Sequence, residues 1–166
     1  MTHESSSAAS TSASEPATDT PKREARVEVT WAGEHRFDAG RPGSPTSRLD
    51  GDGTTGQSPV DGLLSALAAC SAADVVDIMA KRRTPVERLR VEVRGERREE
   101  LPRRFTKIEL RYIVDGAGID APHVERAIAL SHEKYCSVGA TLAPDVEISS
   151  VAIVNEARAD RPATAS

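Results

Sequence analysis

The longest stretch dominated by apolar and small side chains lies between residues 58 and 83. Only a narrow polar stripe interrupts it, so its apolar surface is wider than a surface helix needs. Its apolar members are Leu63, Leu64, Leu67, Ala68, Ala69, Ala72, Val75, Val76 and Ile78. The pattern predicts one long, mostly buried central helix with Cys70 at its middle.

Both ends of this helix carry boundary signals. Ser58 can accept a backbone N–H as the N-cap, Pro59 suits the first helical position, and Asp61 approximates a capping box. Residues 81–83 place positive charge on the last turn, where the helix dipole favours it, and Pro85 prevents continuation.

Alternation of apolar and polar positions predicts β-strands before this helix. Residues 27–31 and 35–38 alternate on either side of a turn at 32–34, which is typical of a hairpin. Residues 40–57 are rich in Gly, Pro, Ser, Thr and Asp and predict a long loop, in which 48–50 is a short extended piece.

Alternation also predicts strands after the helix. Residues 86–97 and 105–114 form two strands with one solvated face, joined through 99–102, and 146–154 form the last strand. A second helix begins after Asp120 and ends near residues 135–136. Its apolar face is made of Val124, Ala127, Ile128, Ser131 and Tyr135. Residues 137–142 predict a further short helix.

This order of elements predicts an α+β fold in which antiparallel sheets and helices bury one another. The central helix is more apolar than one small sheet needs. A dimer in which the central helices of two protomers pack together would account for the excess.

Composition divides the chain of 166 residues into three parts. Residues 1–24 are mostly Ser, Thr, Ala and Pro and predict a disordered N-terminal tail. Residues 25–155 are expected to form one domain. Residues 156–166 revert to Ala, Arg, Asp and Pro and predict a frayed C-terminal tail.

Charge and composition exclude several partner classes. A net charge of −4 and 3% aromatic residues provide neither the basic patch nor the stacking platform of a nucleic-acid-binding protein. We expect no membrane span and no secretion signal, and therefore a soluble, cytoplasmic protein. In that compartment the two cysteines are expected to be reduced at rest.

Motifs for metals and cofactors are missing from the sequence. The four histidines and two cysteines show no metal-ligand spacing, so we expect no metal. Residues 50–54 resemble a calcium loop but lack its glycine at position six and its glutamate at position twelve. Nucleotide-binding and α/β-hydrolase motifs are also missing, and we expect no cofactor.

Three motifs together resemble the OsmC/Ohr family, and most closely its YhfA-like branch. The first is Ser58-Pro-x-x-x-Leu-Leu-x-Ala-Leu-x-x-Cys70, the second is Asp74-Val-Val, and the third is Lys134-Tyr-Cys136-Ser-Val. The resemblance covers residues 27–154, and the two cysteine segments come in the family's order.

The resemblance implies an intertwined homodimer with antiparallel sheets around long central helices, and a thiol-dependent peroxidase that reduces organic hydroperoxides. By this resemblance Cys70 is the peroxidatic thiol, which attacks the O–O bond and becomes a sulfenic acid. Cys136 is the resolving thiol, which forms a disulfide with Cys70, and an external dithiol reduces that disulfide.

The chain departs from the family pattern around the first thiol. Peroxidase members have a glutamate directly after the helix-starting proline, and it pairs with an arginine that supports the thiolate; here that position is Val60. Asp61 is an acid but is rotated by about 100° on a helix, and a capping role explains it equally well. Arg48 is the candidate arginine, with Arg36 as the alternative, and a solvated surface role is open for both.

Two further residues bear on thiol reactivity. Asp74 lies one turn after Cys70, where a negative charge would raise the pKa of a thiol, and it could equally line a polar edge of a dimer interface. His132 lies one turn before Cys136 and could modulate it, or could be a surface histidine. The alternative function is a dimeric redox-responsive or small-ligand-binding protein without efficient peroxidase turnover.

Overall fold

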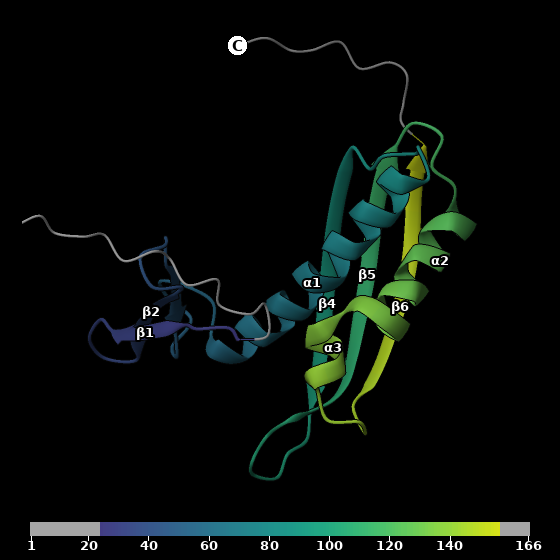
Figure 1. The fold of residues 1–166 in the computed structure, drawn as a ribbon. Coiled ribbons are helices and arrows are strands. Elements are labelled where there is room, and N and C mark those ends of the chain that lie inside the picture. The colour runs from purple at the N-terminus through teal and green to yellow at the C-terminus, as the bar shows by residue number, and fades with distance from the viewer. Residues whose placement is uncertain (1–23, 157–166) are drawn as a thin grey trace, which may run out of the picture.

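The computed structural model describes residues 24–156 and contains two three-stranded sheets and the helices that connect and cover them (Figure 1). The α+β plan is therefore confirmed, and the predicted tails lie almost entirely outside the described residues. The elements are β1 (Glu28–Trp31), β2 (Arg36–Gly40), β3 (Ser47–Asp50), α1 (Pro59–Lys81), β4 (Arg88–Arg97), β5 (Phe105–Gly116), α2 (Ala121–Leu130), a π-helical turn η1 (Ser131–Tyr135), α3 (Ser137–Thr141) and β6 (Glu147–Glu156).

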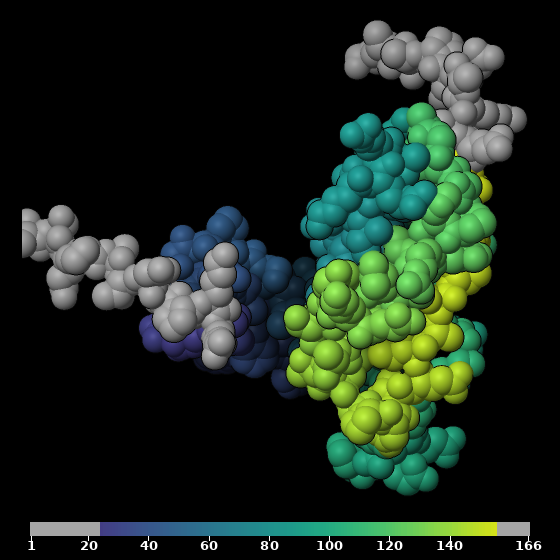
Figure 2. Space-filling view, turned by 45° about the vertical axis from the view of Figure 1, so that its right-hand side comes forward, coloured from purple at the N-terminus to yellow at the C-terminus, as the bar shows by residue number. Residues whose placement is uncertain are grey.

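The first sheet has the order β1-β2-β3 and is antiparallel throughout. It contains the predicted hairpin, and the short extended piece predicted at 48–50 is its third strand. This sheet lies beyond the N-terminal end of α1, away from the second sheet, and forms a separate lobe in the space-filling view (Figure 2).

The second sheet has the order β4-β5-β6 and mixes two kinds of pairing. β4 and β5 are antiparallel, as expected for strands joined by a short loop, but β6 runs parallel to β5. The expectation of purely antiparallel sheets is wrong at this pair, because α2, η1 and α3 carry the chain back across the sheet before β6 begins.

Helix α1 begins with the predicted cap. The Ser58 hydroxyl accepts the Asp61 N–H at 3.1 Å and the Asp61 carboxylate accepts the Ser58 N–H at 3.3 Å, which completes the capping box. One face of α1 packs against the second sheet through Leu67, Ala68, Ser71, Val75 and Met79. The expectation of a mostly buried helix is wrong for the single chain, because the sheet covers only one side and leaves Leu63 40% and Val76 39% exposed.

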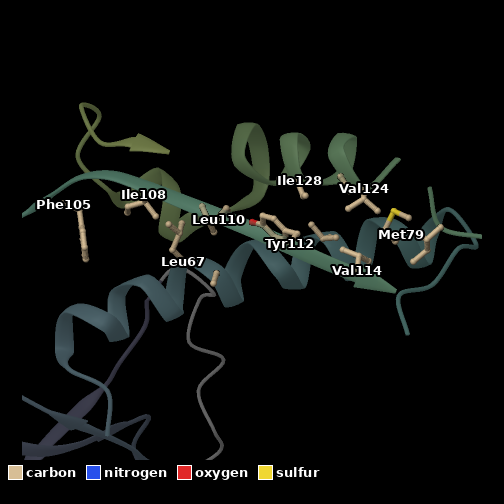
Figure 3. Close-up of a cluster of buried hydrophobic side chains, with 14 residues drawn as sticks. Leu67, Met79, Phe105, Ile108, Leu110, Tyr112, Val114, Val124 and Ile128 are labelled. Carbon is tan, nitrogen blue, oxygen red and sulfur yellow. The ribbon is translucent and has the colours of Figure 1, made fainter. Parts of the chain in front are cut away.

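The hydrophobic core lies between α1, α2 and the inner face of β5. Figure 3 shows β5 side chains in contact range of both helices, with Leu67 and Met79 contributed by α1 and Val124 and Ile128 by α2. The inward-facing residues of β5 are Phe105, Ile108, Leu110, Tyr112 and Val114. Tyr112 is the largest fully buried side chain, and its hydroxyl needs a hydrogen-bond partner.

By length and composition alone, α1 could also cross a membrane, whereas the sequence pattern predicted no such segment. Core helices of water-soluble proteins meet the same criterion. Many of the apolar residues of α1 are alanines, which contribute to its hydropathy although their side chains are small.

Candidate functional site

The structure brings Cys70 and Cys136 together. Cys70 lies half-buried at the middle of α1, and Cys136 lies between η1 and α3 with only 3% of its surface exposed. Both thiols are free. Burial raises the pKa of the Cys136 thiol, and the neighbouring Cys70 and Asp74 raise it further, against the opposing effect of the Gly139 N–H, which donates to Sγ at 3.4 Å.

A π-helical turn places Cys136. The Cys136 N–H donates to the Ser131 carbonyl at 2.8 Å, five residues earlier, so this turn is wider than an α-helical one. The wider turn changes which residues point inward. Tyr135, predicted on the apolar face, is 47% exposed, and Cys136 points into the core instead.

A network of buried hydroxyl groups lies beside the two thiols. Ser71, the residue after Cys70, has its hydroxyl 2.5 Å from the Tyr112 hydroxyl and 3.2 Å from that of Ser131. Ser131 also donates to the Asp74 carboxylate at 2.7 Å. These contacts connect α1, β5 and η1, and Ser71, Tyr112 and Ser131 are all fully buried.

The far end of the network is His132. Its Nε2 lies 3.5 Å from the Tyr112 hydroxyl. Burial lowers the pKa of His132, although the Asp74 carboxylate acts in the opposite direction. Burial also raises the pKa of Tyr112 to about 12, so its hydroxyl stays protonated at neutral pH and can donate a hydrogen bond.

Sequence reasoning identified Cys70, Cys136, Asp74 and His132 but missed the hydroxyl groups. One signal was present: Ser131 falls among apolar residues on the predicted inner face of the second helix. A polar side chain in such a position must find a buried partner. The partners of Ser131 are Ser71 and Asp74, which lie on α1, so their identity required the fold.

Arg48 lies on strand β3, at the short extended piece that the sequence predicted for residues 48–50. Its guanidinium makes a bidentate ion pair with Asp38, directly opposite on β2, with distances of 2.6 and 3.1 Å. This hydrogen-bonded pair lowers the pKa of Asp38 and raises that of Arg48. Asp38 was not predicted as a partner, although its place opposite Arg48 follows from the register of β2 against β3.

Other candidates near the helix start have structural partners. Asp61 accepts the Ser58 hydroxyl at 2.7 Å in the capping box, so the capping interpretation of Asp61 is confirmed. Val60, at the position of the family's glutamate, is half-buried and packs against the core. Arg36 pairs with Glu34 at 2.8 Å in the first sheet.

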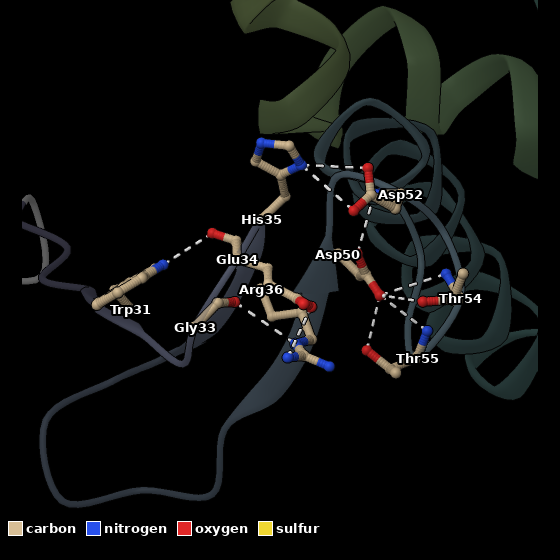
Figure 4. A network of polar contacts seen from close by, with 9 residues as sticks. All are labelled: Trp31, Gly33, Glu34, His35, Arg36, Asp50, Asp52, Thr54 and Thr55. Atoms are coloured by element: carbon tan, nitrogen blue, oxygen red, sulfur yellow. Dashed lines mark hydrogen bonds and ion pairs between the residues drawn. The ribbon is translucent and has the colours of Figure 1, made fainter.

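The loop that resembled a calcium site is organised by its own hydrogen bonds. The buried Asp50 carboxylate accepts the backbone N–H groups of Asp52, Thr54 and Thr55 and both threonine hydroxyls (Figure 4). These bonds, led by the Thr55 hydroxyl, hold the pKa of Asp50 far below its usual range. Among residues 24–156, no group of three or more His, Cys, Asp or Glu side chains could hold a metal ion.

Two surface pockets flank the hydroxyl network. One, of about 420 Å³, is lined by Asp74, Asp77, Lys81 and Tyr135 among others. The other, of about 450 Å³, lies between His132, α3 and β6. Asp74 and His132, the two ends of the network, therefore each border an open pocket.

The sequence is similar to one known protein family and to a curated bacterial protein. The sequence model of a family described as OsmC-like protein matches residues 51–151, which include both cysteines. Protein YhfA of Escherichia coli is 46% identical over 101 residues, which are 60% of this chain and 75% of YhfA.

Solved structures share the fold. An OsmC-like protein from Mycoplasma pneumoniae superposes with a TM-score of 0.66 at 17% identity, covering 81% of this chain and 98% of that one. The organic hydroperoxide resistance protein OhrB of Bacillus subtilis superposes with a TM-score of 0.54 at 16% identity, covering 78% and 98%. At these identities the similarity concerns the fold.

Proposed function

The chain belongs to the OsmC-like protein family, and from this premise we propose that it is a thiol-dependent peroxidase that reduces organic hydroperoxides. The observation that carries the proposal is the pair of free thiols on α1 and after η1, close enough for one to raise the pKa of the other. The name of the B. subtilis protein OhrB, which shares the fold, agrees with this substrate class.

The exposure of the two thiols supports the roles that we propose for them. Cys70 is half-buried and can meet a peroxide from solvent, whereas Cys136 is buried behind it. In the first step the Cys70 thiolate attacks the terminal oxygen of the hydroperoxide and the O–O bond breaks. Cys70–SOH forms, and the alkoxide takes up a proton and leaves as the alcohol. In the second step the Cys136 thiol displaces that hydroxyl, so that a disulfide and one water form. An external dithiol then reduces the disulfide, and we place this cycle in the cytoplasm, where such reductants are abundant.

The proposal includes a homodimer. The single chain leaves apolar side chains exposed on two elements, Leu63 and Val76 on α1 and Val29 and Trp31 on β1, with Trp31 67% exposed. A second copy that covers these surfaces would bury them in an isologous interface. Arg48 is in the lobe that contains β1, so its support of a Cys70 thiolate depends on this assembly.

Steady-state consumption of an organic hydroperoxide, with dithiothreitol as the reductant, tests the proposal. Cys70→Ser should abolish turnover, and Cys136→Ser should permit one sulfenic acid to form without a disulfide. A Cys70→Ser protein that retains full turnover would contradict the proposed role of Cys70 in a peroxidase.

Arg48→Ala tests the cationic support of the thiolate. A thiolate that loses a neighbouring cation becomes scarcer at neutral pH, so turnover should fall by about tenfold or more. Arg41→Ala is the matched control, because Arg41 is an exposed arginine of the same lobe, and it should leave turnover unchanged.

Two observations favour a second candidate, a redox-responsive or small-ligand-binding protein without efficient turnover. Val60 replaces the glutamate of the family's peroxidases, and Arg48 is already paired with Asp38. For this candidate, Arg48→Ala would not change peroxide reactivity, and native mass spectrometry of the purified dimer would detect a bound small molecule.

A further inference from the structure

We propose that Ser131 and Asp74 are positioning residues for the second thiol: they fasten the π-helical turn to α1 and so hold Cys136 beside Cys70. The inference rests on the proposed function only in giving Cys136 the resolving role. The positioning would favour a disulfide between Cys70 and Cys136 in any reaction that forms one, with or without a peroxide.

Ser131 connects the two thiol-bearing segments with two different groups. Its carbonyl accepts the Cys136 N–H at 2.8 Å, and its hydroxyl donates to Asp74 on α1 at 2.7 Å. Asp74 lies one helical turn after Cys70 on α1. Two hydrogen bonds therefore connect α1 to Cys136: the charge-assisted bond from Ser131 to Asp74 and the backbone bond from Cys136 to Ser131.

The neighbouring contacts make this connection stiff. An ionised carboxylate only accepts, and Ser131 has one hydroxyl proton, which leaves the Ser131 oxygen free to accept from Ser71. Ser71 in turn contacts the buried Tyr112 on β5 at 2.5 Å. Because these hydroxyls are fully buried, losing one partner leaves a polar group without water to replace it.

Asp74 also acts on Cys136 through its charge. The titratable groups around Cys136 are Cys70 and Asp74 on α1, Tyr112 on β5 and His132 on η1. Glu133, Lys134 and Tyr135, which precede Cys136 in the chain, are exposed titratable residues of the same segment. Since burial, Cys70 and Asp74 all raise the pKa of Cys136, the carboxylate helps to keep this thiol protonated until it reacts.

Equilibration with reduced and oxidised glutathione tests the positioning without any peroxide. The protein dithiol and oxidised glutathione exchange to the protein disulfide and two reduced glutathiones, and the equilibrium constant gives the effective concentration of one thiol at the other. Ser131→Ala should lower this constant by about tenfold, because the π-helical turn loses its attachment to α1.

Ser137→Ala is the matched control, since Ser137 is an exposed serine on the other side of Cys136, and it should leave the constant unchanged. Asp74→Ala removes the acceptor of the Ser131 hydroxyl at the half-exposed end of the network. It serves as the second test variant if Ser131→Ala does not fold. Wild-type constants in both Ser131→Ala and Asp74→Ala would overturn the proposal, even if the protein proves to be a peroxidase. A lowered constant would support it, even if peroxide turnover is absent.

A second measurement separates the charge of Asp74 from its hydrogen bond. Asp74→Asn keeps an acceptor for the Ser131 hydroxyl but removes the negative charge. In a Cys70→Ser background, iodoacetamide should therefore alkylate Cys136 at least about twofold faster at pH 8, and the midpoint of the pH profile should move down. Asp77→Asn, an exposed acid one turn along α1, is the control. Identical profiles for Asp74→Asn and Asp77→Asn would overturn the electrostatic part.

Discussion

At the scale of single residues, the two thiols differ in their exposure to solvent. Cys136 is buried among groups that raise its pKa, while Cys70 is half-buried on α1 and reachable from solvent. Under the proposed function, a peroxide would therefore react with Cys70 first, and Cys136 would remain a protonated thiol until the second step. This asymmetry is what a two-cysteine peroxide cycle needs, because a second reactive thiolate at the surface would compete for the oxidant.

His132 predicts a dependence of stability on pH. Burial lowers its pKa in the folded protein, whereas the unfolded chain has the ordinary value of about 6.5. As pH falls below about 6.5, the unfolded chain binds a proton that folded His132 does not, so the free energy of unfolding decreases, by at most about 1.4 kcal/mol per pH unit for one proton. The decrease stops once the pH is below the folded pKa.

Urea unfolding between pH 7.5 and pH 5.5 checks this prediction. His132→Gln should make the loss of stability in that range smaller, whatever its effect on stability at pH 7.5. His35→Gln, which replaces an exposed histidine of the first lobe, should leave the loss in place. Equal slopes for wild type and His132→Gln would show that His132 does not carry the effect.

The sequence predicted the residues that belong to local motifs and missed those that depend on distant partners. Cys70 and Asp61 could be assigned from their neighbours in the chain. The partner of Arg48 could not be assigned in this way, because Asp38 lies on the neighbouring strand β2. The partners of Ser131 could not be assigned either, because they lie on α1. For Asp61, the structure shows which of its two open roles it takes, because its carboxylate completes the capping box.

At the scale of elements, helix α1 depends on its N-terminal cap. Ser58→Ala removes the hydroxyl that accepts the Asp61 N–H and donates to the Asp61 carboxylate, and it should lower the free energy of unfolding by about 1 kcal/mol. Urea unfolding at fixed protein concentration measures the change. Ser149→Ala, an exposed serine on β6, should change stability by less than about 0.5 kcal/mol, and an equal loss in both variants would contradict the capping account.

The strands and the long helix follow from periodicity and end signals, but two features of the elements do not. The π-helical turn has no recognisable sequence pattern. It leaves Tyr135, predicted on the apolar face, exposed, and it buries Cys136. The parallel pairing of β5 and β6 depends on how the whole α2–α3 segment crosses the sheet, and alternation within one strand cannot report it.

At the scale of the whole molecule, the exposed apolar residues of α1 and β1 predict a dimer. Light scattering should give a mass of about twice the 17.7 kDa of one chain. Val76→Glu places a charge on the exposed side of α1, where it would cost little in a monomer but should shift a dimer toward monomers. Leu101→Glu, in the β4–β5 loop, should leave the mass unchanged. A wild-type protein that stays monomeric at micromolar concentration would contradict the dimer.

The most direct test of the central claim is the reaction of pre-reduced protein with one equivalent of an organic hydroperoxide, followed by intact mass and a count of free thiols. Two lost thiols and a mass lower by about 2 Da, formed faster than with hydrogen peroxide, are the predicted result, because Cys70 and Cys136 then form a disulfide. Thiols that stay reduced for hours would contradict the peroxidase account and leave the ligand-binding alternative.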